Sequence, residues 1–231
     1  MAGCSASRCL SEMCRRLAAA LCAAGVLACG ALAAATPLSP RPGTSSLHPV
    51  FTWSLPANER SQGLFVANSP DVGPDGRFPD DNVVASTGFA NDDRQWSPGP
   101  LYAGHYWWLV WSSDRTTSQS YYSAPADFTV PVSMTLFQVK TVRSTFLHLL
   151  ALRVRWTANT HALTVRARVL KGKRVVWQST QPQVNKVGFS YSTSFGWYKP
   201  RSIKRGTRLR LHVTLRAQGV HTTRTLAFRA P

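Results

Sequence analysis

Cysteine is missing from most of this chain, because all five cysteines, at positions 4, 9, 14, 22 and 29, lie within the first 29 residues. The remainder must fold without disulfides and without a thiolate zinc site. The six histidines form no HxH or HxxxH pair, and the aspartates between residues 71 and 93 lack the spacing of an EF-hand calcium loop. We therefore expect no metal and no cofactor, and each domain must be held by its own apolar core.

Acidic residues are missing from the whole C-terminal part. Residues 131–231 contain 19 Lys or Arg and no Asp or Glu, whereas residues 36–130 contain nine acidic and five basic residues. A segment without carboxylates supplies no general acid–base pair and cannot orient a histidine through a carboxylate. The chain also lacks a G-x-S-x-G elbow and a Gly-rich phosphate loop. We therefore expect no catalytic residues and no enzymatic activity.

An uncharged run rich in Ala and Leu is present at residues 17–35, and it follows Arg8, Arg15 and Arg16. With the small-x-small motifs at 31–35, this pattern predicts a secretory signal peptide at residues 1–35. Two alternatives stay open. An uncleaved run would anchor the protein in a membrane, and residues 26–29 resemble a bacterial lipobox, in which Cys29 would be lipidated. Each of these interpretations predicts a protein that is secreted or associated with the cell envelope. The excess of Arg over Lys, together with the Ala-rich start, indicates a bacterial source.

Residues 36–49 are rich in Pro, Gly and Ser, which predicts a linker. Short apolar runs then alternate with turn residues, and no convincing 3.6-residue apolar period occurs. This pattern predicts strands at 50–53, 63–67, 82–85, 106–111 and 126–130, and a loop at 68–81. Residues 50–131 are therefore expected to form an all-β domain.

Three motifs in this domain resemble a fibronectin type III domain of exported bacterial proteins. Residues 51–53 are similar to the second strand with its core Trp, residues 101–110 to a tyrosine corner entering the sixth strand, and residues 122–130 to the last strand. The resemblance implies that Tyr106, Trp108 and Val110 face the core and that the Tyr106 hydroxyl bonds to upstream backbone. Trp107 and Trp111 then share the opposite face. They would form an aromatic binding face, unless a loop or the second domain covers them.

Residues 132–231 show seven strand-like runs with two-residue apolar alternation, near 134–141, 147–156, 162–170, 173–178, 186–195, 207–216 and 222–229. This spacing predicts an antiparallel sandwich that looks similar to an immunoglobulin-like module. The expected fold class is thus all-β: two tandem antiparallel β-sandwich domains, fibronectin type III-like and then Ig-like, after an N-terminal signal helix.

The outward positions of these strands are basic. We expect the runs at 162–170 and 207–216 to be neighbours, which would join four arginines in one patch, and an anionic envelope polymer or membrane surface is the expected partner. There are three alternatives: the charge serves solubility, it docks onto the acidic first domain, or the protein is a spacer that binds another envelope protein. The export signal argues against nucleic acid as a physiological partner. The predicted polyanion-binding residues are Arg153, Arg155, Arg166, Arg168, Arg208 and Arg210.

Overall fold

The computed structural model describes residues 34–89, 92–144 and 149–231. In these ranges the chain is all-β, as predicted, and its one helical element is the 3-10 turn η2 (Asp80–Asn82). None of the described helical structure is long and apolar enough to cross a bilayer. The predicted signal segment, up to residue 33 and with Cys29 in it, lies outside the described residues.

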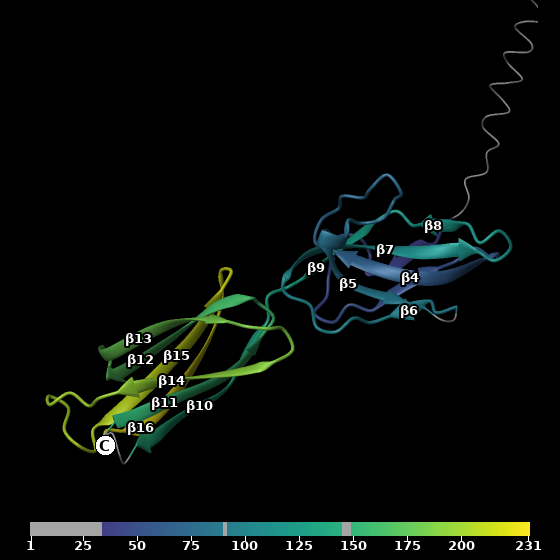
Figure 1. The fold of residues 1–231 in the computed structure, drawn as a ribbon. Helices are drawn as coiled ribbons and strands as arrows, with labels where there is room; N and C mark the ends of the chain where they lie inside the picture. Colours follow the sequence, from purple (N-terminus) through teal and green to yellow (C-terminus); the bar gives the residue numbers. More distant parts are fainter. Residues whose placement is uncertain (1–33, 90–91, 145–148) are drawn as a thin grey trace, which may run out of the picture. The chain divides into compact units, whose positions relative to one another are not determined.

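Residues 36–130 form a first β-sandwich of two sheets (Figure 1). One sheet has the strand order β1-β3-β6, and the other has the order β2-β9-β7-β4-β5 with β8 beside β7. Both sheets bury side chains in one shared core, which includes Phe51, Trp53, Trp108 and Phe128. The strands are β1 (Thr36–Ser39), β2 (Thr44–Ser45), β3 (Phe51–Ser54), β4 (Glu59–Ala67), β5 (Val83–Gly88), β6 (Gln95–Trp96), β7 (Gly104–Asp114), β8 (Ser120–Tyr122) and β9 (Ala126–Val130).

The segment that we expected to be a linker, residues 36–49, is instead part of this sandwich. Strand β1 pairs with β3, with Thr36 opposite Ser54, and strand β2 pairs with β9. Both are short strands at the ends of their sheets, where proline is tolerated because no ladder hydrogen bond is lost. The Pro-rich composition of this segment therefore gave no indication of strands β1 and β2.

Residues 134–229 form a second sandwich, whose sheets have the orders β10-β11-β14 and β13-β12-β15-β16. The seven predicted strands are all present in the described part of this segment. Their side chains bury one core around Trp156, Trp197, Phe195 and Leu211. The strands are β10 (Met134–Ser144), β11 (Leu149–Ala158), β12 (Ala162–Lys171), β13 (Arg174–Val184), β14 (Ser190–Trp197), β15 (Arg208–Ala217) and β16 (Val220–Arg229).

The two sandwiches share one topology. When the main strands of each are counted in chain order, leaving out β2 and β8, strands 1-2-5 form one sheet and strands 4-3-6-7 the other. In both, the fourth strand pairs with the third, whereas in a constant-type immunoglobulin domain it joins the first sheet. Each half of the described chain is therefore a fibronectin type III/Ig-like β-sandwich.

Alternation along the strands sets which side chains reach solvent in the second sandwich. On β12, Val165, Ala167 and Val169 are fully buried, while Arg166 and Arg168 between them point outward. The same alternation along β15 buries its odd-numbered residues and exposes the even-numbered ones at its start. Because side chains on a strand alternate between faces, every second residue of these strands lies on the outer surface.

Candidate anion-binding surface

The first sandwich contains the tyrosine corner that the sequence predicted. The Tyr106 hydroxyl donates a hydrogen bond to the Tyr102 carbonyl oxygen at 2.9 Å. Burial, with a smaller contribution from Tyr102, raises the pKa of Tyr106, so the phenol stays neutral as this bond requires. Trp108 and Val110 are fully buried on the same face of β7. This face of β7 is therefore structural.

Trp107 and Trp111 share the other face of β7 but do not form one open platform. Leu109, which lies between them, is fully buried in a small cluster with Phe78, from the 68–81 loop. Trp107 stacks on His105 with ring centroids 4.4 Å apart, and Trp111 stacks on Tyr122. A loop thus covers the centre of the predicted aromatic binding face, and both indoles are half-buried.

Acidic side chains of the first sandwich have local partners. Arg77 forms an ion pair with Asp80, and Arg115 forms one with Asp92. The His105 Nε2 lies 2.9 Å from the Asp127 Oδ2, within hydrogen-bond distance. Between residues that the structure describes, the two arginine pairs are the only ion pairs that Lys or Arg forms. Across the described ranges no group of three His, Cys, Asp or Glu side chains gathers as metal ligands would.

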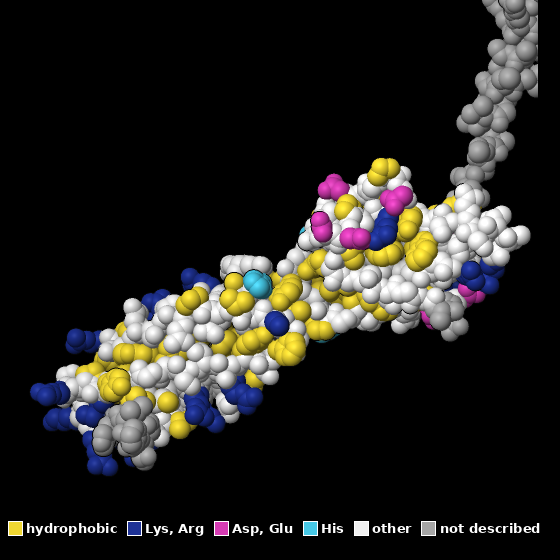
Figure 2. All heavy atoms as spheres, in the orientation of Figure 1, with side chains coloured by type: hydrophobic (Ala, Val, Ile, Leu, Met, Phe, Trp, Pro, Cys, Tyr) yellow, Lys and Arg dark blue, Asp and Glu magenta, His cyan; other side chains and the backbone are white. Residues whose placement is uncertain are grey.

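The basic side chains of the second sandwich have no acidic partners. Among the described residues none of its 19 Lys and Arg side chains forms an ion pair, and residues 131–231 contain no Asp or Glu of their own. Figure 2 shows one face of the molecule. On this face, basic side chains (dark blue) are spread over the second sandwich, and acidic side chains (magenta) occur only on the first sandwich. Uncompensated like charges repel one another and attract anions, and nearby anions would reduce that repulsion.

The six predicted arginines fall on two opposite sheets. Strands β12 and β15 are antiparallel neighbours, so Arg166, Arg168, Arg208 and Arg210 share the outer face of the four-stranded sheet, as expected. Strand β11 belongs to the other sheet, where it pairs with β10 and β14. Arg153 and Arg155 therefore form a separate basic surface.

The outer face of the four-stranded sheet has a hollow of about 470 Å³. Arg166 Nη2 donates to the Gln178 Oε1 at 2.9 Å, and Arg210 Nη2 donates to the Gly172 carbonyl oxygen at 2.7 Å. These acceptors are neutral, so they position the guanidinium groups without cancelling their charge. The hollow is lined by Thr164, Arg166, Arg168, Thr180, His212, Thr214, Arg216, His221 and Thr223.

The outer face of the three-stranded sheet has a second hollow, of about 450 Å³, lined by Gln138, Lys140, Arg153, Arg155, Ser192, Thr193 and Ser194. Lys140 lies opposite Arg153 in the β10–β11 register. The guanidinium of Arg155 lies over the Phe137 ring, 5.5 Å from its centroid. This face aligns three Lys or Arg residues, fewer than the outer face of the four-stranded sheet.

Sequence reasoning missed several residues of these surfaces, including Lys140, His212, Arg216 and His221. Two of them could have been found from the alternation along β15, because His212 and Arg216 lie on the same outward face as Arg208 and Arg210. Lys140 and His221 depend on which strands become neighbours, which alternation alone does not specify. The threonine hydroxyls of the first hollow add neutral donors beside the arginines.

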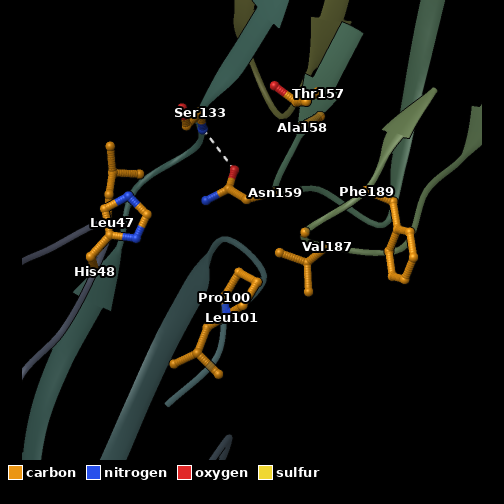
Figure 3. Close-up of a pocket in the computed structure, with 11 residues that line it drawn as sticks. Leu47, His48, Pro100, Leu101, Ser133, Thr157, Ala158, Asn159, Val187 and Phe189 are labelled. Carbon is orange, nitrogen blue, oxygen red and sulfur yellow. Dashed lines mark hydrogen bonds between the residues drawn. The ribbon is translucent and has the colours of Figure 1, made fainter. Parts of the chain in front are cut away.

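Another hollow, of about 260 Å³, is lined without any Lys, Arg, Asp or Glu. Figure 3 shows the Asn159 side chain there, whose oxygen accepts a hydrogen bond from the Ser133 backbone N–H at 2.7 Å. Asn159 Nδ2 also donates to the Pro131 carbonyl oxygen at 2.8 Å. These bonds fasten the segment that enters β10, and the lining offers an anion no Lys or Arg side chain.

No known family model matches the chain, and no curated protein matches it. Solved structures that resemble it include the FN1–FN3 domains of chicken CNTN1, at 16% identity with a TM-score of 0.29, over 84% of this chain and 66% of that one. Dimeric latent PorU from Porphyromonas gingivalis is 13% identical, with a TM-score of 0.32, over 87% of this chain and 20% of that one. A DUF3823 family protein from Bacteroides ovatus is 13% identical, with a TM-score of 0.30, over 85% and 97% of the two chains. The chain thus spans slightly under two thirds of the CNTN1 structure and a fifth of the PorU structure.

Proposed function

We propose that this protein is a non-catalytic, exported bacterial protein that binds anionic components of the cell envelope through its basic second sandwich. The first sandwich is proposed to be a member of the fibronectin type III family. The ligand classes are a wall polymer, an acidic polysaccharide or lipid head groups.

The observation that supports this function is the uncompensated charge of residues 131–231, with 19 basic residues and no acidic residue on a folded sandwich. Its outward arginines stand in rows beside hydroxyl groups rather than beside carboxylates. Arginine presents a planar fork of donors that matches the oxygens of phosphate and carboxylate groups. Such a surface favours polyanions over neutral partners.

The alternative is a spacer or protein-interaction module of the cell surface, supported by the tandem arrangement of two sandwiches with one topology. Salt separates these functions, because replacing counterions on a polyanion makes affinity fall steeply with salt, whereas an apolar protein contact does not weaken in this way.

The test is sedimentation of the protein with a bacterial cell-wall fraction, and separately with anionic vesicles, at about 50 and about 500 mM NaCl. We expect strong binding at the lower concentration and loss of binding at the higher one. Absence of binding to both materials at both concentrations would refute the proposed function and favour the spacer.

A further inference from the structure

The register of the four-stranded sheet places one arginine of β12 or β15 in each of five successive rows. Successive outward residues of a strand are about 7 Å apart. Counted along β15, Arg216 stands in the first row, opposite Thr164, and Arg166 in the second, opposite Thr214. Arg168 stands in the third row, opposite His212. Each of these rows therefore contains one arginine.

The series of rows continues to the far end of β15. Arg210 stands in the fourth row, opposite Leu170 on β12, and Arg208 stands in the fifth, opposite Arg229 on β16. The series of arginines follows the seam between β12 and β15 and extends about 27 Å over eight residue steps. We call it the basic track, and its residues are Arg166, Arg168, Arg208, Arg210 and Arg216.

The two arginines in the middle of the track lie close against the sheet surface. The Nε atoms of Arg166 and Arg168 are inaccessible to solvent and have no hydrogen-bond partner. Both arginine residues are half-buried overall, and they line the hollow together with the threonine hydroxyls. Arginines held in this way lose little side-chain freedom when an anion binds, which favours affinity.

Resting on the proposed function, we propose that the basic track is the ligand site and that its ligand is a linear polymer lying along the β12–β15 seam. The row spacing matches a chain that presents one oxyanion per repeating unit of about 7 Å. Phosphodiester and carboxylate polymers share this chemistry. The ligand is proposed to be a chain rather than a membrane because three of the five arginines line a hollow, whereas a flat bilayer needs a broad exposed patch.

The experiment compares three proteins. In the track variant, Arg166→Gln, Arg168→Gln and Arg210→Gln remove three charges from the track. In the matched control, Lys140→Gln, Arg153→Gln and Arg155→Gln remove three charges from the opposite sheet. Synthetic oligo(glycerol phosphate) and oligogalacturonate are the phosphodiester and carboxylate probes, each in a length that reaches two rows and a length that reaches five.

We expect the track variant to lose affinity for the long probe on the order of a hundredfold, and its plot of log affinity against log salt to become shallower by about 2. The control should lose less than about fivefold, through long-range field alone. For the wild type, the five-row probe should bind at least tenfold more tightly than the two-row probe. The probe class that shows these effects identifies the oxyanion.

Equal losses in the two variants, or affinity that does not depend on probe length, would overturn the track while leaving polyanion binding intact. Stronger, track-dependent binding to anionic vesicles would assign the surface to lipid and overturn the linear ligand. If the wild type binds none of these materials, the proposed function itself fails. A second track variant with Arg→Lys at the same three positions keeps the charge, so it tests the guanidinium fork even if the Gln variant folds poorly.

Discussion

At the scale of single residues, the first sandwich depends on polar side chains that close its loops. The buried Tyr106 hydroxyl ties β7 to the preceding turn, and Asp114 closes the turn after β7 by accepting the backbone N–H groups of Thr116 and Thr117. Trp53 Nε1 donates to Ser61 Oγ at 2.8 Å inside the core. Buried donors and acceptors are costly to leave unpaired, so these bonds should be measurable one by one.

Replacing Tyr106→Phe should lower the free energy of unfolding of the first sandwich by about 1–2 kcal/mol, because the Tyr102 carbonyl loses its donor. Urea denaturation followed by tryptophan fluorescence measures the change. Tyr198→Phe is the control, since Tyr198 is 66% exposed and should tolerate the change. Equal stability of the Tyr106 variant and the wild type would contradict a structural role for the corner.

Asp114 should make the first sandwich sensitive to acid. The Thr117 and Thr116 backbone N–H groups hold the pKa of Asp114 below its usual value. A carboxyl whose pKa is lowered by folding stabilises the fold above the ordinary Asp pKa, and that contribution is lost as the pH falls through the lower value. In Asp114→Asn, the dependence of stability on pH between about 5 and 2 should become shallower. Asp81→Asn, an exposed change in η2, should keep the wild-type slope.

At the scale of elements, strands with strong alternation were predictable and strands at sheet ends were not. Strands β11, β12 and β15 have clear alternation, and the sequence located each of them within a few residues. The segment of strands β1 and β2 has the composition of a linker, because prolines and serines fill it, and this composition gives no sign of the strands. The sheet to which each strand belongs could not be predicted from the sequence either. No local sequence pattern indicates that Arg153 lies on the opposite sheet from Arg166, because long-range strand pairing decides this.

Arg224 links the edges of the two sheets in the second sandwich. Its Nη1 donates to the Phe137 carbonyl oxygen at 2.5 Å and to the Leu136 carbonyl oxygen at 3.3 Å, at the bulge of β10. Arg224→Gln should therefore destabilise this sandwich by about 1 kcal/mol, whereas Arg174→Gln, on an exposed strand start, should have little effect. Differential scanning calorimetry measures both variants. Similar melting temperatures for the two would contradict a linking role for Arg224.

At the scale of the whole molecule, charge is segregated between two sandwiches with one topology. Residues 36–130 have a net negative charge, and residues 131–231 have only positive charges. The first sandwich uses its carboxylates in local pairs and turns, while the second has none to use. Self-repulsion should therefore lower the stability of the second sandwich at low ionic strength.

Raising NaCl from about 20 to about 500 mM should increase the melting temperature of the second sandwich, because salt screens repulsion between its basic side chains. The first sandwich should change less, since it contains both signs of charge. Calorimetry on the intact protein, with two resolved transitions, provides the measurement. If the second transition falls or stays constant, repulsion does not limit the stability of this sandwich.

The absence of carboxylates from the second sandwich also makes it an almost constant electrostatic surface. Lys and Arg keep their charge throughout the physiological pH range, and residues 131–231 contain no carboxylate side chain. A decrease in binding on acidification would accordingly report protons taken up by the ligand. A carboxylate polymer would release near pH 4, whereas a phosphodiester polymer would stay bound. The pH at which binding is lost would therefore report the pKa of the acidic groups of the ligand.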